Sequence, residues 1–550
     1  MASSHAMNRR HFLQLVSALA SSGGLLASCG QENGHSISGE FVGPSFQIGH
    51  LLREGGIPPP TQENNIPVVI IGGGVSGLCA AWKLKKAGFH DFRLFELESE
   101  CGGNAQFGEN RISAYPWGAH YLPIPTHESK AVVELLDELG VIQGYASSGV
   151  PLFREEYLCF DPQERLYLHG RWQEGLLPMV GATRNDLEEY NRFKDLILSY
   201  RHHRGNDGRK PFAIPMEFSS RDPDFLILDR ISMHQYLEQN NFHSRFLHWY
   251  VNYACRDDFG TDYRRVSAWA GLHYFASRDA GEDEMENASV LTWPEGNGWI
   301  VRRLREKLKE SIATQALVYR LSPSQNAVEV EVYHPLERRS SRVRAQHVIF
   351  ASPRFLAPYL LNPREIDTSE ISREFEYAPW MVANVSLKQF PAPRTGFPLA
   401  WDNVIYDSES LGYVVATHQS LKTAIQETVF TYYYAMTGTP ASQERTRLLK
   451  TDWKSWLDFI LRDLGKPHPE IASLITQVEV FRWGHAMIRP RPGFMWGTAR
   501  QDGAKSIGNI HFAHSDLSGF SIFEEAQYPG NLAAEKILEA YRIPFHSSIV

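Results

Sequence analysis

The pattern of apolar and polar positions is clearest near residue 70, where an apolar run leads into a glycine-rich turn and then a helical pattern. Val68 to Ile71 is apolar throughout, which is typical of a strand buried on both faces. Apolar residues then recur at a spacing of three and four, which predicts a helix with one buried face: Val75, Leu78, Cys79 and Trp82. A second apolar strand is expected at Phe92 to Phe95. The pattern therefore predicts strand, turn, helix and strand.

The turn carries the glycines of a G-x-G-x-x-G motif, and each has a distinct expected role. Gly72 permits the tight turn, Gly74 lets a pyrophosphate approach the backbone, and Gly77 lets the helix pack closely on the strand. The free N–H groups of the first helical turn, at Val75 and Ser76, are expected to hold the anion. In this context the motif predicts a site for an adenine dinucleotide.

Residues after the second strand distinguish flavin from nicotinamide. Glu96 suits hydrogen bonds to ribose hydroxyls and repels a 2′-phosphate. Gly102, Gly103 and Asn104 follow at a short distance. This arrangement resembles the flavin-containing amine oxidase superfamily, which includes phytoene desaturases and protoporphyrinogen oxidases. The resemblance implies FAD as cofactor, with Gly102, Gly103 and Asn104 against its diphosphate, and an α/β fold in which a Rossmann-like FAD-binding domain is interleaved with an α+β substrate domain.

Later stretches add to this resemblance. Ala114 to Tyr121 stands where relatives present a turn to the flavin, which implies contacts from Gly118 and Ala119. Val318 opens the segment that in relatives touches the adenine end. Asn509 to Asp516 resembles the closing F-A-G-E/D motif, which implies further cofactor contacts from Asp516, Gly519 and Glu524.

These motifs, together with shifts in composition, predict the organisation of the chain. We expect an export signal and lipobox at 1–29, a linker at 30–65, FAD-binding segments at 66–150, 289–358 and 486–550, and substrate-domain segments at 151–288 and 359–485. The helix of the first FAD-binding segment beyond the motif is expected to end at Gly140, a normal C-terminal cap.

The resemblance is weaker at the catalytic centre. His120 is a candidate polar contact or proton acceptor, and a histidine that only hydrogen-bonds the backbone near the cofactor is an equal alternative. Trp483 is a candidate pocket wall and His485 a second polar group. His514 replaces the glycine of the closing motif, Trp380 to Val385 lacks the lysine common in amine oxidases, and Ile522 stands near an expected aromatic position of the amine cage. These departures weaken the amine interpretation.

The N-terminal residues resemble an export signal. Arg9 and Arg10 precede a modest apolar stretch, and Leu26 to Cys29 resembles a bacterial lipobox. We expect an exported periplasmic or cell-surface lipoprotein that is tethered to the membrane through a lipid on Cys29; the alternative is a plain signal peptide.

Composition restricts the partners. The net charge of −8 over 550 residues argues against nucleic acid, and 43% hydrophobic residues indicate a well-packed globular chain. The sequence lacks C-x-x-C and H-E-x-x-H spacings, so no metal site is expected.

The expected function is that of an FAD-dependent oxidoreductase, which removes a hydride from a small hydrophobic or amphiphilic substrate by amine oxidation or carbon–carbon dehydrogenation. Oxygen or a quinone would accept the electrons. Two alternatives stay open: a redox-neutral flavin isomerase that moves a double bond in an unsaturated lipid, and a non-catalytic, FAD-stabilised binding lipoprotein.

Overall fold

A parallel sheet built around the glycine motif positions the candidate site. In the computed structural model, which describes residues 36–278, 289–362, 366–422 and 424–549, five parallel strands lie in the order β13-β4-β3-β17-β23. Their bounds are β13 Ile312–Ala313, β4 Phe92–Phe95, β3 Val68–Ile71, β17 His347–Phe350 and β23 Ile510–Phe512. Segments far apart in the sequence therefore meet in one sheet, as the predicted interleaved α/β fold requires.

The central strand β3 is buried on both faces. Val68 and Ile70 pack into a core with α4 (Val75–Lys86), α11 (Gly298–Leu308) and α18 (Phe523–Ala540). Val69 and Ile71 pack into a second core on the opposite face. The continuous apolar run thus has the environment that it predicted. The amphipathic helix expected before Gly140 is α5 (Lys130–Glu138).

A second sheet is antiparallel except for one edge strand, which pairs in parallel. Its order in the described residues is β14-β15-β16-β2, with bounds β14 Leu317–Pro323, β15 Val328–His334, β16 Arg339–Ala345 and β2 Pro60–Asn65. Val328, Val330 and Val332 are fully buried, as their alternation predicts. Between them, Glu331 is also buried, because Arg342 pairs with its carboxylate at 3.1 Å.

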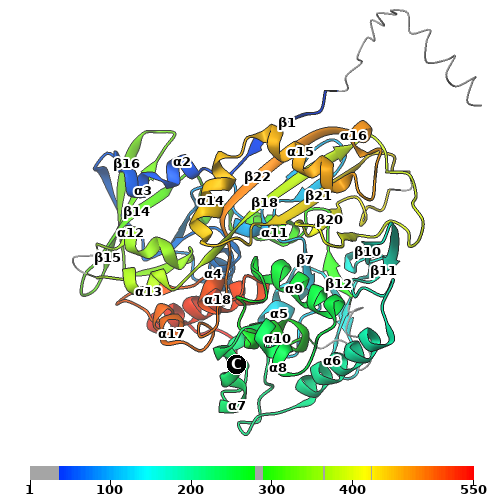
Figure 1. Ribbon diagram of the computed structural model, residues 1–550. Coiled ribbons are helices and arrows are strands. Elements are labelled where there is room, and N and C mark those ends of the chain that lie inside the picture. The colour runs from blue at the N-terminus through cyan, green and yellow to red at the C-terminus, as the bar shows by residue number, and fades with distance from the viewer. Residues whose placement is uncertain (1–35, 279–288, 363–365, 423, 550) are drawn as a thin grey trace, which may run out of the picture. The chain divides into compact units, whose positions relative to one another are not determined.

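The largest sheet of the described chain has the order β1-β22-β18-β21-β20-β19-β10-β11. Its bounds are β1 Ser38–Val42, β22 Ile475–Ile488, β18 Tyr377–Leu387, β21 Thr428–Ala435, β20 Gly412–Val415, β19 Asp402–Ile405, β10 Glu164–Leu168 and β11 Arg171–Glu174. One face packs against α14 (Ala441–Lys450), α15 (Trp453–Leu464) and α16 (Ile471–Leu474) (Figure 1). The other face borders the candidate site.

A helical region completes this second domain. Its helices are α6 (Arg184–His202), α7 (Pro223–Leu226), α8 (Met233–Gln239), α9 (Arg245–Phe259) and α10 (Ala268–Ala276). They form one group in Figure 1. Buried aromatic side chains of α9 and α10, among them Tyr253, Phe259 and Trp269, join the core that also holds Val69 and Ile71. The helical region is therefore packed against the nucleotide sheet by a shared core.

Short elements connect these parts. They are β5 Phe107–Glu109, β6 Ala114–Pro116, β7 Tyr121–Pro123, β8 Ile142–Tyr145, β9 Pro151–Phe153, β12 Val290–Thr292, α2 Phe46–Gly49, α3 Leu51–Glu54, α12 Ala357–Leu360, α13 Ser369–Arg373 and α17 Thr498–Gly503. Within the described residues, helices of the length and apolarity needed to span a membrane are absent.

The structure differs from the expected linker at residues 30–65. β1 pairs in parallel with β22, and β2 pairs in parallel with β16. Between them, the Glu98 carboxylate accepts hydrogen bonds from the Ser45 N–H at 2.9 Å and from its hydroxyl at 2.8 Å. Edge pairing uses backbone groups, so a polar, glycine-rich composition does not reveal it. The export signal and lipobox at 1–29 lie outside the described residues, and the other domain boundaries stay predictions.

The Ser45–Glu98 contact gives a testable prediction. Glu98→Ala removes the acceptor that holds residues 43–55 against the nucleotide domain, so the chain should open locally more often. We expect trypsin to cut after Arg53, which is exposed, several-fold faster than in the unaltered protein. Glu109→Ala, at an exposed glutamate of β5, is the matched control and should leave the rate unchanged. Equal rates for both variants would contradict this role of Glu98.

Candidate active site

The turn between β3 and α4 has the geometry that its glycines predicted. The Gly72 N–H donates to the Phe95 carbonyl at 2.9 Å, and Gly72 has a φ of +101°. A Cβ on Gly72 would stand 2.7 Å from the Ala351 carbonyl oxygen, and one on Gly77 would overlap the Gly72 carbonyl oxygen. Gly72 and Gly77 therefore allow β3, β17 and α4 to approach one another closely.

Gly74, by contrast, borders an open space. In the described chain the nearest atom to a Cβ placed there is the Gly103 Cα, at 3.9 Å. The Gly102 N–H donates to the Gly73 carbonyl at 2.9 Å, so the two glycine turns face each other. We call the space between Gly72–Gly74 and Gly102–Gly103 the glycine cradle.

The cradle has the properties of an anion site. The N-terminus of α4 points into it, and among the described residues it carries neither a side-chain cap nor an acidic residue in its first turn. The Ser76 hydroxyl is buried and lacks a hydrogen-bond partner in the described chain. Unpaired N–H groups and the helix dipole favour negative charge at this place. The cradle therefore fits the pyrophosphate of a dinucleotide, as predicted.

Glu96 lies at the edge of the cradle. Its carboxylate accepts hydrogen bonds from the Gly73 N–H at 2.6 Å and the Glu98 N–H at 2.8 Å. Burial raises the pKa of Glu96 to about 7 despite these bonds. The Glu96 carbonyl accepts from the Ala316 N–H at 2.8 Å, which brings the start of β14, and with it Val318, to the same edge. The two segments from which ribose and adenine contacts are expected are therefore neighbours.

The second glycine turn is joined to the turn before His120. The Asn104 carbonyl accepts from the Ala119 N–H at 2.7 Å, and a Cβ on Gly118 would overlap the Asn104 oxygen. The Asn104 side-chain amide donates to the Ala486 carbonyl in β22. The structure therefore brings together Asn104, Gly118 and Ala119, which the sequence placed at the cofactor.

His120 lies among aromatic rings. Its ring centroid is 4.8 Å from that of Tyr433, 4.9 Å from Tyr121 and 5.4 Å from Trp401. Burial lowers the pKa of His120 to about 4, against the smaller opposing effect of a hydrogen bond to the Gly118 backbone. The imidazole is therefore neutral at neutral pH, which suits a hydrogen-bond partner or proton acceptor.

Trp483 reaches the same turn from β22. Its indole N–H donates to the Trp117 carbonyl at 2.7 Å, while the Tyr433 hydroxyl donates to the Gly118 carbonyl at 2.9 Å. Trp483 also stacks on Phe481, with ring centroids 4.3 Å apart. Trp483 and the Tyr433–His120 pair therefore both attach to the backbone at residues 117–120.

His485 lies in a different neighbourhood from His120. Its ring stacks on Phe355, with centroids 4.1 Å apart, and meets Tyr377 edge-on at 6.0 Å. Burial, with smaller contributions from Arg445, His50 and Arg53, lowers the pKa of His485 to about 3, although the residue has accessible surface. The catalytic roles of His120, Trp483 and His485 stay predictions.

Asp516 is engaged by protein groups. Its Oδ2 accepts from the Arg354 N–H at 2.7 Å and from the Tyr377 hydroxyl, and its Oδ1 lies 3.1 Å from His514 Nδ1. Burial by itself would raise the pKa of Asp516, but His514 and these hydrogen bonds outweigh it and lower the pKa. The imidazole that replaces the motif's glycine thus pairs with the displaced acid.

The remaining residues of the closing motif lie close by in sequence. Gly519 packs against Met495, where a Cβ would stand 2.6 Å from the sulfur. Glu524, in the first turn of α18, is buried and forms an ion pair with Arg278. The cofactor roles of Val318, Asp516, Gly519 and Glu524 stay predictions.

A cavity of about 160 Å³ is lined by Tyr121, whose ring contacts that of His120. Its lining includes Tyr121, Tyr253, Asp258, Tyr274, Arg278 and Ile522. These residues come from β7, α9, α10, the segment after α10 and the segment before α18. The cavity therefore lies where the helical region meets the nucleotide domain, with aromatic walls and charged groups.

Three carboxyl groups lie at or near this cavity: Asp258 lines it, and Asp257 and Asp402 are close enough for their charges to raise the pKa of Tyr121 in its wall. We call the three the acidic cluster. Burial raises the pKa of Asp258 to about 6, against the opposing charge of Arg278, and raises that of Asp402 to about 7. Burial and the charges of Asp258 and Asp402 raise the pKa of Asp257 well above its usual range. Because Arg278 is paired with Glu524, the cluster lacks full compensation and favours a cation nearby.

Sequence reasoning missed Tyr433, Trp401 and Asp402. The run Tyr432, Tyr433 and Tyr434 in β21 carries a partial signal, since neighbouring residues of a strand face opposite sides. Tyr432 and Tyr434 pack into the core beneath α15, and Tyr433 faces His120. The alternation predicts that Tyr433 lies on the opposite face of the strand from Tyr432 and Tyr434. It does not predict His120 as the contact on that face, because His120 comes from another part of the chain.

Comparisons with known proteins agree with this geometry. Residues 70–139 match the model of an NAD(P)-binding Rossmann-like domain. A stretch of 86 residues is 40% identical to the Baeyer-Villiger monooxygenase peniC of Penicillium patulum, and it spans 16% of this chain and 12% of that protein. The sequence match to this relative is thus confined to a small part of either chain.

Solved structures match over most of the chain. Putrescine oxidase bound to putrescine has a TM-score of 0.61 at 16% identity, covering 87% of this chain and 100% of its own. Cyclohexylamine oxidase from Brevibacterium oxydans has a TM-score of 0.62 at 15% identity, and the match covers 87% of this chain and 100% of that protein. The CLA-producing fatty acid isomerase from P. acnes has 0.59 at 14% identity, covering 86% and 98%. The chain therefore shares the fold of these proteins.

Two glycines of the cradle offer a matched test. Gly74→Ala adds a methyl group to open space at a backbone conformation that alanine adopts, so the melting temperature of the dinucleotide-free protein should stay unchanged. The same methyl should occupy the cradle and weaken dinucleotide binding roughly tenfold or more. Gly77→Ala, which overlaps the Gly72 carbonyl, should lower both stability and binding. Unchanged dinucleotide affinity in Gly74→Ala would place the pyrophosphate elsewhere.

Proposed function

We propose that this protein is an FAD-dependent oxidoreductase that oxidises a small cationic amine with an apolar part. The observation that carries the proposal is an aromatic-walled cavity that Tyr121 and Asp258 line, with Asp257 and Asp402 close by. The finding that the fold is shared with putrescine oxidase and cyclohexylamine oxidase supports the reaction class by analogy.

The cofactor assignment rests on the cradle. Gly74 and the first turn of α4 would hold the diphosphate, and Glu96 the ribose of the adenosine. Asn104, Gly118 and Ala119 would lie farther along, where their backbone is tied together. When bound, FAD would supply the two-electron oxidant that the protein side chains lack.

The residues of the chain have the remaining tasks. Asp258 and Asp402 would attract the ammonium group, and Tyr121, Tyr253 and Tyr274 would enclose the apolar part and exclude water. His120, neutral because its pKa is about 4, would accept a hydrogen bond from the substrate.

An unsaturated fatty acid fits the cavity less well. Its carboxylate would need a cation, and the Arg278 guanidinium in the lining is already paired with Glu524. Arg201, also in the lining, donates to the Phe275 carbonyl at 2.8 Å. A second anion beside the acidic cluster would be repelled. These charges favour an amine over the lipid substrate of an isomerase.

An anaerobic titration tests the proposal. The purified flavoprotein is mixed with a cationic alkyl amine, a neutral alcohol of the same shape, or an unsaturated fatty acid, and the visible band of oxidised flavin is followed. We expect bleaching with the amine only, and recovery when air is admitted. Conversion of the fatty acid without net bleaching would favour the isomerase. A flavin that no ligand bleaches would support a non-catalytic protein.

The acidic cluster also predicts a pH dependence. The Asp402 carboxyl, with a pKa of about 7, becomes protonated as the pH falls from 8 to 6, so kcat/KM for a cationic amine should fall over this range. Asp402→Asn should flatten this dependence and weaken amine binding roughly tenfold or more.

A stability measurement on the same variant separates loss of function from misfolding. A carboxyl whose pKa is raised on folding stabilises the protein fully only below its unfolded pKa and loses that contribution as the pH rises through 7. Asp402→Asn should therefore raise the melting temperature at pH 8. Asp458→Asn, on the exposed side of α15, should change neither property. A melting temperature that falls in Asp402→Asn would contradict the assignment.

We further propose that the chain is exported and tethered through a lipid on Cys29. The support is the sequence alone: the paired arginines, the short apolar stretch and the lipobox-like residues before Cys29. Incorporation of labelled fatty acid into the full chain, lost in Cys29→Ala, would support the tether.

A further inference from the structure

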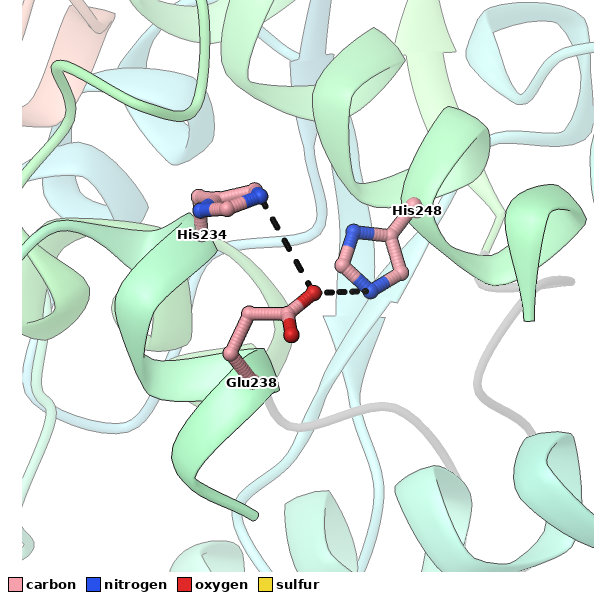
Figure 2. A group of neighbouring side chains, drawn as sticks. All are labelled: His234, Glu238 and His248. Carbon is pink, nitrogen blue, oxygen red and sulfur yellow. Dashed lines mark ion pairs between the residues drawn. The ribbon is translucent and has the colours of Figure 1, made fainter. Parts of the chain in front are cut away.

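A cluster of potential metal ligands lies outside the candidate active site, at the junction of α8 and α9. Figure 2 shows its members: His234 and Glu238 on α8, and His248 on α9. His234 and Glu238 are four residues apart, so they share one face of the helix. We propose that these three residues bind a divalent transition-metal ion, with Zn²⁺ as the typical occupant.

The distances suit such an ion. Glu238 Oε1 lies 3.9 Å from His234 Nε2 and 3.7 Å from His248 Nε2 (Figure 2), and the potential ligand atoms all lie within 4.8 Å of one another. Two tetrahedral ligands at the usual Zn–N and Zn–O lengths of 2.0–2.1 Å are about 3.3 Å apart. Small side-chain rotations would therefore close the site around the ion, without movement of either helix.

The hydrogen bonds of His248 are those of a metal ligand with an outer partner. Its Nδ1 lies 2.9 Å from the Tyr263 hydroxyl, and its Nε2 lies 2.8 Å from the Phe242 carbonyl. Without metal, Nε2–H donates to the carbonyl and Nδ1 accepts from tyrosine. A metal ion on Nε2 would take the place of this hydrogen bond, so the ring would turn away from the Phe242 carbonyl, and the proton would stand on Nδ1 and be donated to the Tyr263 oxygen. Metal-bound histidines commonly have such an outer hydrogen bond.

The surroundings accept a positive ion. Arg264 is close enough to oppose charge on His234, but its guanidinium lies 3.5 Å from the Asp262 carboxylate. His243 Nδ1 lies 3.7 Å from Glu238 Oε2, so another imidazole stands on the open side. A cavity of about 500 Å³ that opens to solvent is bordered by His234, Glu238, His243 and His248. This cavity gives the ion a path to the cluster. Two imidazoles and one carboxylate favour zinc, nickel or copper over magnesium or calcium.

This site is not indicated by any metal-ligand motif in the sequence. The residues have the spacing H-x3-E-x9-H, which differs from the C-x-x-C and H-E-x-x-H motifs, so no metal was expected. Among the described residues the cavity at this cluster and the one beside His120 have no lining residue in common. Bound metal would fasten α8 to the first turns of α9, the helix that continues to Tyr253 and Asp258 of the candidate active site.

A calorimetric titration tests the proposal. The full-length flavoprotein is stripped with EDTA, dialysed and titrated with ZnCl₂, and its melting temperature is measured with and without the ion. We expect binding of one equivalent and a higher melting temperature with zinc. Glu238→Gln keeps the size of a half-exposed side chain and should weaken zinc binding at least about tenfold, as should His234→Ala.

The control variant removes histidines elsewhere. His202→Ala/His203→Ala alters an exposed pair at the end of α6 and should leave stoichiometry, affinity and thermal stabilisation unchanged. Absence of zinc binding, zinc binding that Glu238→Gln leaves intact, or binding that disappears only in the control would overturn the proposal. Because Glu238→Gln removes no buried group, its failure to bind zinc with an unchanged melting temperature of the metal-free protein would support a direct ligand role.

Discussion

The contact between the β3–α4 turn and its neighbours supports the rest of the candidate site. A Cβ at Gly77 would overlap the Gly72 carbonyl, and one at Gly530 of α18 would overlap the Ser76 carbonyl. Backbone thus lies directly on backbone on both sides of α4. This close approach fixes the direction of the N-terminus of α4. From there, the Gly102 N–H donates to the Gly73 carbonyl, and the Ala119 N–H donates to the Asn104 carbonyl, so the turns that carry Asn104 and His120 are connected to it. If α4 moved outward, the cradle would widen, and the turns that carry Asn104 and His120 would no longer be held in place relative to it.

The buried carboxyl groups of the second domain reduce the stability of the folded protein, which indicates that they serve in binding. Asp257, Asp258 and Asp402 have raised pKa values because burial disfavours their ionised forms. Folding would be more favourable with neutral residues there, and a bound cation would remove much of the penalty. The same helix, α9, presents His248 to a second set of potential ligands at its other end. Both sites depend on how α9 packs, so α9 would couple metal and substrate binding if both occur.

The interleaving of domains explains why a weak sequence signal accompanies a clear fold. The nucleotide sheet takes strands from residues 68–95, 312–313, 347–350 and 510–512, and the larger sheet extends to β1 at residues 38–42. Only the first of these segments carries a compact motif, and the family model matches residues 70–139 alone. β1 and β2 join their sheets through backbone hydrogen bonds, which place few demands on side chains. Their polar composition therefore resembled that of a linker.

The sequence by itself determined the local structure around the dinucleotide: the buried strand Val68–Ile71, the glycine turn, the amphipathic helix α4 and the acidic residue Glu96. These features depend on backbone conformation and on the period of apolar residues, both of which are local properties. Tertiary structure alone decided what faces His120 and which acids lie at or near the cavity, because Tyr433, Trp401, Asp258 and Asp402 come from segments more than 100 residues away. It also decided that His248 of α9 meets His234 and Glu238 of α8. Pairwise contacts of this kind depend on how helices and sheets pack, and the residue pattern of one segment does not contain that information.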